Sequence, residues 1–176
     1  MKKYSFILIY LLFASNLFFA QTQKKEVYEL NWLKDKSWHL IQDNEMPAFT
    51  VQLYTPPNET IDNWSVLGNT THYKNVEDMP LDTLMYKMFY QTRNLFSQAQ
   101  LHFIAKNENT KKNWILFYMD VPEVSAEKAA DSQILHLTIG KNGIYSSIIT
   151  VKKRHFTDSE IKKFSAFLRK SKLVYK

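Results

Sequence analysis

Apolar and polar residues alternate along much of the chain, which predicts extended strands. Between residues 48 and 54, Phe49, Val51 and Leu53 fall on one face and polar residues on the other, as in a strand with one buried side. In the first half of the chain this reasoning predicts strands at 38–41, 48–54 and 66–73. The first two are expected to form an antiparallel pair.

The second half of the chain predicts four more strands, at 101–105, 114–121, 134–139 and 144–151. Residues 114–119 are apolar without a break, so this strand is expected to be covered on both faces and to be central. Asn142 and Gly143 fit a tight hairpin between the last two strands. Residues 107–112 have the composition of an exposed loop, and residues 123–131 that of a polar crossover.

Two helices are predicted. Apolar residues recur at steps of three and four between residues 81 and 97, which indicates an amphipathic helix with one buried stripe. The stripe consists of Leu81, Leu84, Met85, Met88, Phe89, Leu95 and Phe96. A second helix is expected from Thr157 to about Lys170, because Thr157 and Glu160 fit a capping box that Phe156 and Ile161 flank as a hydrophobic staple.

One or two helical turns are also expected between Glu59 and Trp64, with Asn58 as the cap. Glu59 and Asp62 stand three residues apart, a spacing that puts two carboxylates on one face of a helical turn, as a sugar-cleaving or cation-binding site uses. Acidic residues at the start of a helix are ordinary, so the structural reading is favoured.

The predicted order of elements indicates an α+β fold, a mainly antiparallel β-sheet packed with a mid-chain and a C-terminal helix. This order, together with the segment 56–64, which includes Asn58, Glu59, Asp62, Asn63 and Trp64, resembles small exported bacterial proteins with a PsbP-like αβα sandwich. The resemblance implies that Trp64 is a buried anchor on the sheet. It also implies a binding or assembly factor in place of an enzyme.

Residues 1–20 are expected to be a cleavable signal peptide, and residues 21–176 a single α+β domain. Lys2 and Lys3 precede a run at 4–13 that is apolar or aromatic except at Ser5, and Ala20 offers a small residue for cleavage. An uncleaved anchor is the alternative, but a membrane-spanning helix needs roughly 20 apolar residues. We therefore expect a periplasmic or secreted protein that is not an integral membrane protein after cleavage.

The chain has no cysteine, which excludes disulfides, thiol catalysis and the lipid anchor of a bacterial lipoprotein. Only three glycines occur, too few and too scattered for a phosphate-binding loop. Five histidines occur without the short spacing of a metal motif, so no metal site, cofactor or catalytic residue is predicted. An envelope hydrolase that uses His with Asp or Glu remains the alternative.

Basic residues gather at the carboxy-terminal end of the chain. Residues 141–176 contain ten Lys and Arg against Asp158 and Glu160. The predicted binding residues are Lys152, Lys153, Arg154, Lys162, Lys163 and Lys170, with Arg169 and Lys172 also placed on the last helix. Outside the cytoplasm the expected partners are an envelope or extracellular protein, a glycan or an anionic lipid surface. Nucleic acid is not expected, because no aromatic residues interleave with the cations. A solvated helix face is the simpler interpretation.

Overall fold

The computed structural model describes residues 26–30, 38–76, 79–108, 113–122 and 131–176. The predicted signal peptide at 1–20, and most of the predicted loop at 107–112 and crossover at 123–131, lie outside these residues. Within the described ranges, neither helix has the length and apolar character that a membrane crossing requires.

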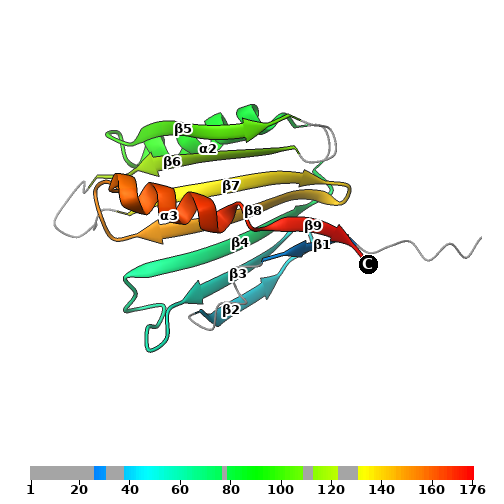
Figure 1. Cartoon of the computed structure of the whole chain (residues 1–176), viewed down its shortest axis with the longest axis horizontal. Helices are drawn as coiled ribbons and strands as arrows, with labels where there is room; N and C mark the ends of the chain where they lie inside the picture. The colour runs from blue at the N-terminus through cyan, green and yellow to red at the C-terminus, as the bar shows by residue number, and fades with distance from the viewer. Residues whose placement is uncertain (1–25, 31–37, 77–78, 109–112, 123–130) are drawn as a thin grey trace, which may run out of the picture.

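Seven strands form one antiparallel sheet in the order β2-β3-β4-β8-β7-β6-β5 (Figure 1). The strands are β2 (His39–Glu45), β3 (Phe49–Thr55), β4 (Val66–Lys74), β5 (Gln100–Asn107), β6 (Trp114–Asp120), β7 (Ser132–Gly140) and β8 (Gly143–Val151). Each predicted strand is therefore confirmed, although the first is longer than predicted and its start lies one residue later.

Two helices cover opposite faces of this sheet. Helix α2 (Leu81–Leu95) packs through Leu81 and Met85 against one face, and helix α3 (Asp158–Leu168) packs through Phe164 and Leu168 against the other. The chain is thus α+β with a dominant antiparallel sheet, as predicted. Leu95 departs from the predicted stripe, because it is 71% exposed at the end of α2.

Strand β6 shows why its sequence is apolar without a break. Ile115, Phe117 and Met119 face α2, whereas Leu116 faces α3, so alternate residues enter two different cores. The prediction of burial on both faces is confirmed. Strand β6 is also an interior strand, paired with β5 and β7, although it lies only one place from the edge of the sheet.

A two-stranded ribbon, which the sequence did not predict, extends the α3 layer. It pairs β1 (Glu26–Glu29) antiparallel with β9 (Lys172–Tyr175), and Tyr28 reaches from it to His136 and Ser147 on the main sheet. Helix α3 begins at the predicted capping box but ends at Leu168 instead of Lys170, because the chain turns there and enters β9. Lys172 therefore lies on a strand and not on the helix.

The predicted helical turn at 59–64 is absent. Asn58 has a φ of 67° in a turn closed by the bond from the Glu59 N–H to the Pro56 carbonyl, so it caps no helix. The Glu59 carboxylate instead accepts the backbone N–H and hydroxyl of Ser65, at 2.7 and 2.6 Å. These bonds stabilise an irregular segment that leads into β4.

The predicted hairpin between β7 and β8 is confirmed, and its glycine is required by the geometry. Gly143 has a φ of 133°, and a Cβ there would overlap the carbonyl oxygen of Tyr73 on β4. Only glycine allows the two backbones to approach this closely.

Candidate functional site: a basic pocket beside the ribbon

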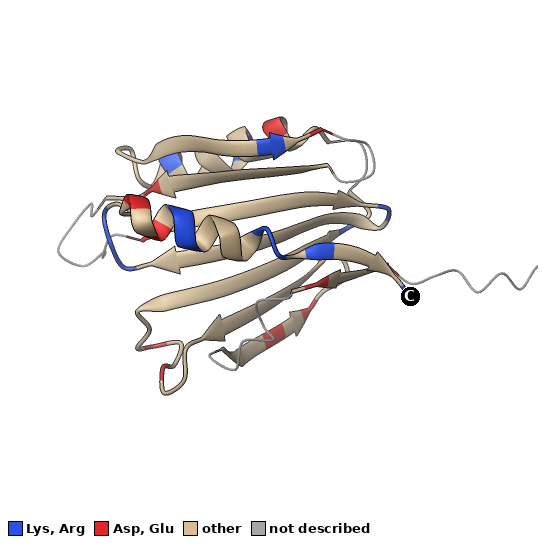
Figure 2. Cartoon of the chain, viewed as in Figure 1, with Lys and Arg blue, Asp and Glu red and all other residues tan. Residues whose placement is uncertain are grey.

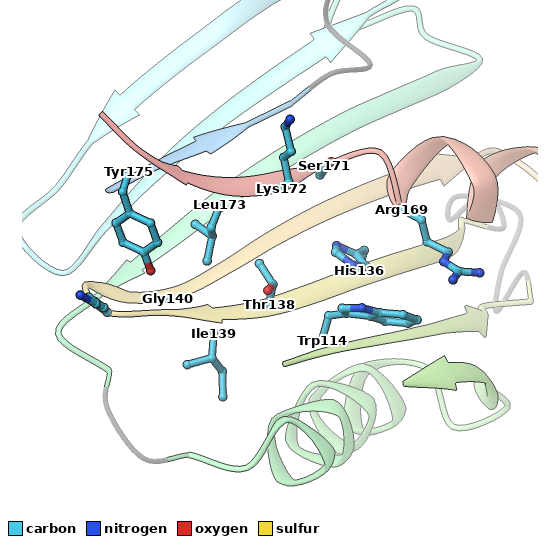
Figure 3. Close-up of a pocket in the computed structure, with 11 residues that line it drawn as sticks. Trp114, His136, Thr138, Ile139, Gly140, Arg169, Ser171, Lys172, Leu173 and Tyr175 are labelled. Atoms are coloured by element: carbon cyan, nitrogen blue, oxygen red, sulfur yellow. The ribbon is translucent and has the colours of Figure 1, made fainter. Parts of the chain in front are cut away.

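A pocket of about 750 Å³ lies on the α3 side of the sheet, between β9 and the start of β6 (Figure 3). Its residues come from β6, from β7 and the turn after it, and from the segment that follows α3. They are Trp114, His136, Thr138, Ile139, Gly140, Lys141, Arg169, Ser171, Lys172, Leu173 and Tyr175. This volume lies in the range of pockets that hold small organic ligands.

The alternation of side chains along β7 determines which of its residues form the floor of the pocket. His136, Thr138 and Gly140 are every second residue of β7, so they share one face of the sheet. Trp114 pairs directly with Thr138 across the β6–β7 ladder and therefore stands beside them. Leu173 and Tyr175, alternate residues of β9, point toward the floor in Figure 3. The pocket thus has an apolar wall on each side of a polar floor.

His136 is a buried histidine at the centre of the floor, with 4% of its surface exposed. Burial, together with the positive charge of Arg169, lowers the pKa of His136 to about 4. The Tyr28 hydroxyl lies 3.3 Å from its Nδ1 and 3.0 Å from the Ser147 hydroxyl. His136 is therefore neutral at pH 7, and as an imidazole it offers one donor and one acceptor.

Of the described residues that line the pocket, three are basic and none is acidic. The Arg169 guanidinium carbon lies 5.0 Å from the centre of the Trp114 ring, and the Lys141 Nζ lies 5.2 Å from the centre of the Tyr175 ring. Lys172 contributes to the lining, but its side chain points away from the floor in Figure 3. Within the described part of the chain, Arg169, Lys141 and Lys172 form no ion pair.

Glu26 holds the ribbon against one end of the pocket. Its carboxylate accepts the backbone N–H groups of Lys141 and Asn142 at 2.7 and 3.0 Å, and the hydroxyls of Tyr145 and Tyr175 at 3.1 and 2.8 Å. Burial by itself would raise the pKa of Glu26, but these four hydrogen bonds outweigh it and lower the pKa. Glu26 therefore stays charged and saturated with donors.

A second cluster of titratable groups lies away from the pocket. Asp120, at the end of β6, is 5% exposed, and its Oδ2 lies 3.0 Å from Nδ1 of His155 and 3.4 Å from Nε2 of His102. The His102 ring stacks on Tyr118 at 4.4 Å between centroids. The sequence did not predict this cluster, because its three members come from distant segments. Even so, no group of three such side chains among the described residues is placed to hold a metal ion.

The predicted basic residues lie on consecutive elements near the carboxy-terminal end of the chain. Lys152 places its Nζ 4.5 Å from the centre of the Trp64 ring, and Lys153 pairs with Glu160 at the start of α3. Lys162 and Lys163 are exposed on α3, and Lys170 lies in the turn after it. Figure 2 shows these cations spread over the β8–α3 connection, α3 and the turn into β9. Arg154 is exposed in that connection.

The segment of Asn58, Glu59, Asp62, Asn63 and Trp64 is an irregular connection between β3 and β4. Trp64 is half-buried under Lys152, so it is not the fully buried anchor that the resemblance implies. Asp62 and Asn63 are exposed, and Glu59 is engaged with Ser65. Because no helical turn forms here, the helical spacing that suggested a paired acidic site of Glu59 and Asp62 does not apply.

Comparison with known proteins adds no relative: no protein-family model matches the chain, and no curated protein matches it. The site therefore rests on its own geometry. The sequence placed Arg169 and Lys172 on the last helix and put His136 within the predicted strand 134–139, but it did not show that they lie together. Only the long-range pairing of β1 with β9 brings them together.

Proposed function

We propose that this chain is an exported, non-catalytic binding module whose ligand is an anionic molecule with an apolar part. The observation that carries the proposal is the pocket itself. Arg169 and Lys141 supply positive charge, and Trp114, Leu173 and Tyr175 supply apolar and aromatic surface. No acidic residue is among the described residues of the lining. Anions with an apolar body match this combination.

The chemistry of the floor supports binding over catalysis. His136 is neutral and lies beside an arginine, and the Tyr28 hydroxyl next to it has its pKa raised to about 12 by burial. Neither group is prepared to exchange a proton near pH 7, where a general acid or base works best. Both are prepared to orient a ligand through fixed hydrogen bonds.

Export and membership of the PsbP-like group belong to the same proposal. The predicted leader at 1–20 supports export, and the absence of cysteine excludes the lipid anchor of a lipoprotein. The order of strands and helices supports the resemblance. Candidate ligands are then acidic components of the envelope or the extracellular space.

A fluorescence titration with anilinonaphthalene sulfonate, an apolar anion, tests the proposed pocket. The wild type should bind the dye, and the double variant Arg169→Ala/Lys141→Ala should bind it about tenfold more weakly, because two charge-assisted contacts are lost. The matched control Lys87→Ala/Arg93→Ala removes the same two residue types from α2, on the opposite face, and should bind as the wild type does.

The outcomes separate the alternatives. No saturable binding by the wild type, or equal loss in both double variants, contradicts the pocket. Loss of binding in Lys162→Ala/Lys163→Ala, with Arg169→Ala/Lys141→Ala unaffected, would instead support the predicted peripheral surface on the last helix.

A hydrolase is a second candidate, favoured by one observation. Asp120 holds His155 through Nδ1 at 3.0 Å, while the His155 side chain is 62% exposed, so a base is positioned toward solvent. Release of nitrophenol from a nitrophenyl ester should then fall to the uncatalysed rate in His155→Gln and persist in His39→Gln. Turnover that is absent in the wild type, or unchanged in His155→Gln, removes this candidate.

A further inference from the structure

Among the described residues, the pocket lies along a strand edge that has no partner strand. Strand β9 pairs with β1 on one side only. The pocket is lined by residues of β9 and the turn before it, and by none of β1, so it lies on the side of β9 away from β1 (Figure 3). The floor of the pocket therefore begins beside the edge of β9 that is not paired with β1.

The backbone groups on this edge are available for hydrogen bonding. Apart from the ladder with β1, the backbone of residues 172–175 makes no hydrogen bond to any described residue. An unpaired strand edge is a template for a further strand, whose N–H and C=O groups supply the missing partners.

The size of the pocket fits one such strand. A four-residue strand in a sheet packed on another sheet occupies about 600 Å³, given about 4.8 Å between strands, about 10 Å between sheets and about 3.3 Å per residue. The pocket holds about 750 Å³. Its floor residues His136, Thr138 and Gly140 also repeat with the two-residue period of an extended chain.

Charge selects the kind of chain that fits. Arg169 precedes β9, and the Lys141 Nζ lies over the ring of Tyr175 within β9, so cations stand near both ends of the open edge. The Glu26 carboxylate at the Lys141 end is saturated by four donors, and no described acidic residue belongs to the lining, so a peptide with carboxylates near Arg169 and Lys141 is complementary in charge.

We propose that the ligand is an extended acidic peptide, which adds to the free edge of β9 as the third strand of the β1–β9 ribbon. This inference rests on the proposed function and names the class of ligand for the same pocket. The bound strand lies above β7, with Trp114 on its far side.

The test uses a capped hexapeptide of alternating aspartate and threonine, with binding to the mature protein measured by calorimetry. Two control peptides have the same sequence but carry N-methyl groups on the backbone at alternate residues. One is methylated at its odd-numbered residues and the other at its even-numbered residues. In a strand bound to β9, the N–H groups of only one of these two sets of residues point toward β9. One methylated peptide should therefore bind like the parent, and the other should bind at least about tenfold more weakly.

Hydrogen exchange gives an independent readout. The parent peptide should slow exchange of one or more backbone amides in residues 172–175, whereas the weakly binding methylated peptide should not. If the two methylated peptides bind with equal affinity, both as tightly as the parent or both more weakly, strand addition is contradicted. If the sulfonate dye binds the pocket and the acidic peptide does not, the proposed function stands and this inference fails. If neither binds, the proposed function fails as well.

Discussion

The buried histidine in the floor of the pocket makes a quantitative prediction about stability and pH. The pKa of His136 is lowered from 6.5 to about 4, first by burial and then by the charge of Arg169. In the unfolded chain the same imidazole takes up a proton below about pH 6.5. The folded state does not, so acid favours the unfolded state.

The sign follows from proton linkage. The contribution of His136 is fully present above pH 6.5 and is lost as the pH falls from 6.5 toward 4. With these two pKa values, the loss amounts to about 2 kcal/mol at pH 5 and about 3 kcal/mol at pH 4, relative to pH 7.5. This is a large part of the stability of an ordinary domain.

Urea unfolding between pH 7.5 and 4 measures this effect in the wild type, in His136→Gln and in the exposed control His39→Gln. The free energy of unfolding of His136→Gln should fall by about 3 kcal/mol less than that of the wild type over this range. The His39→Gln control should keep the wild-type dependence. Identical pH dependence in wild type and His136→Gln would refute the argument that burial keeps His136 neutral.

Three further substitutions test other parts of the structure by urea unfolding. Glu26→Gln puts an amide where the carboxylate accepts four donors and should cost about 3 kcal/mol at pH 7; a loss within experimental error would show that the carboxylate does not hold the ribbon. Thr157→Ala removes the capping box of α3 and should cost about 1 kcal/mol, whereas Thr157→Ser should restore most of it. Gly143→Ala should cost about 3 kcal/mol through its φ of 133° and its contact with β4; wild-type stability would contradict this hairpin geometry.

The main sheet and both helices could be predicted because their signals are local. The apolar run in β6 and the capping box of α3 each express a nearby physical requirement. The alternation in β3 correctly predicted a strand, but residues 49–53 are all partly buried, without one buried and one exposed face. The predicted buried stripe of α2 included Leu95, which has the right spacing but is exposed at the end of the helix. Spacing alone does not show what the end of a helix packs against.

The candidate site could not be predicted, because it depends on pairing between the two ends of the described chain. Glu26 and Tyr175 lie 149 residues apart, and each strand of the ribbon is only four residues long, too short to show a period. Lys172 was placed on a helix because the basic, amphipathic pattern of α3 continues past the point where the chain turns. His136 was recognised as a strand residue, but the sequence did not show which segment would cover it.

Mapping amide chemical shifts in ¹⁵N-labelled protein of residues 21–176 tests most directly whether the pocket beside β9 is the binding surface. On titration with the sulfonate dye, the account predicts shifts concentrated at Thr138–Lys141 and Ser171–Tyr175, together with the indole N–H of Trp114. Shifts confined to the exposed face of α3 around Lys162 and Lys163, or to α2, would contradict it.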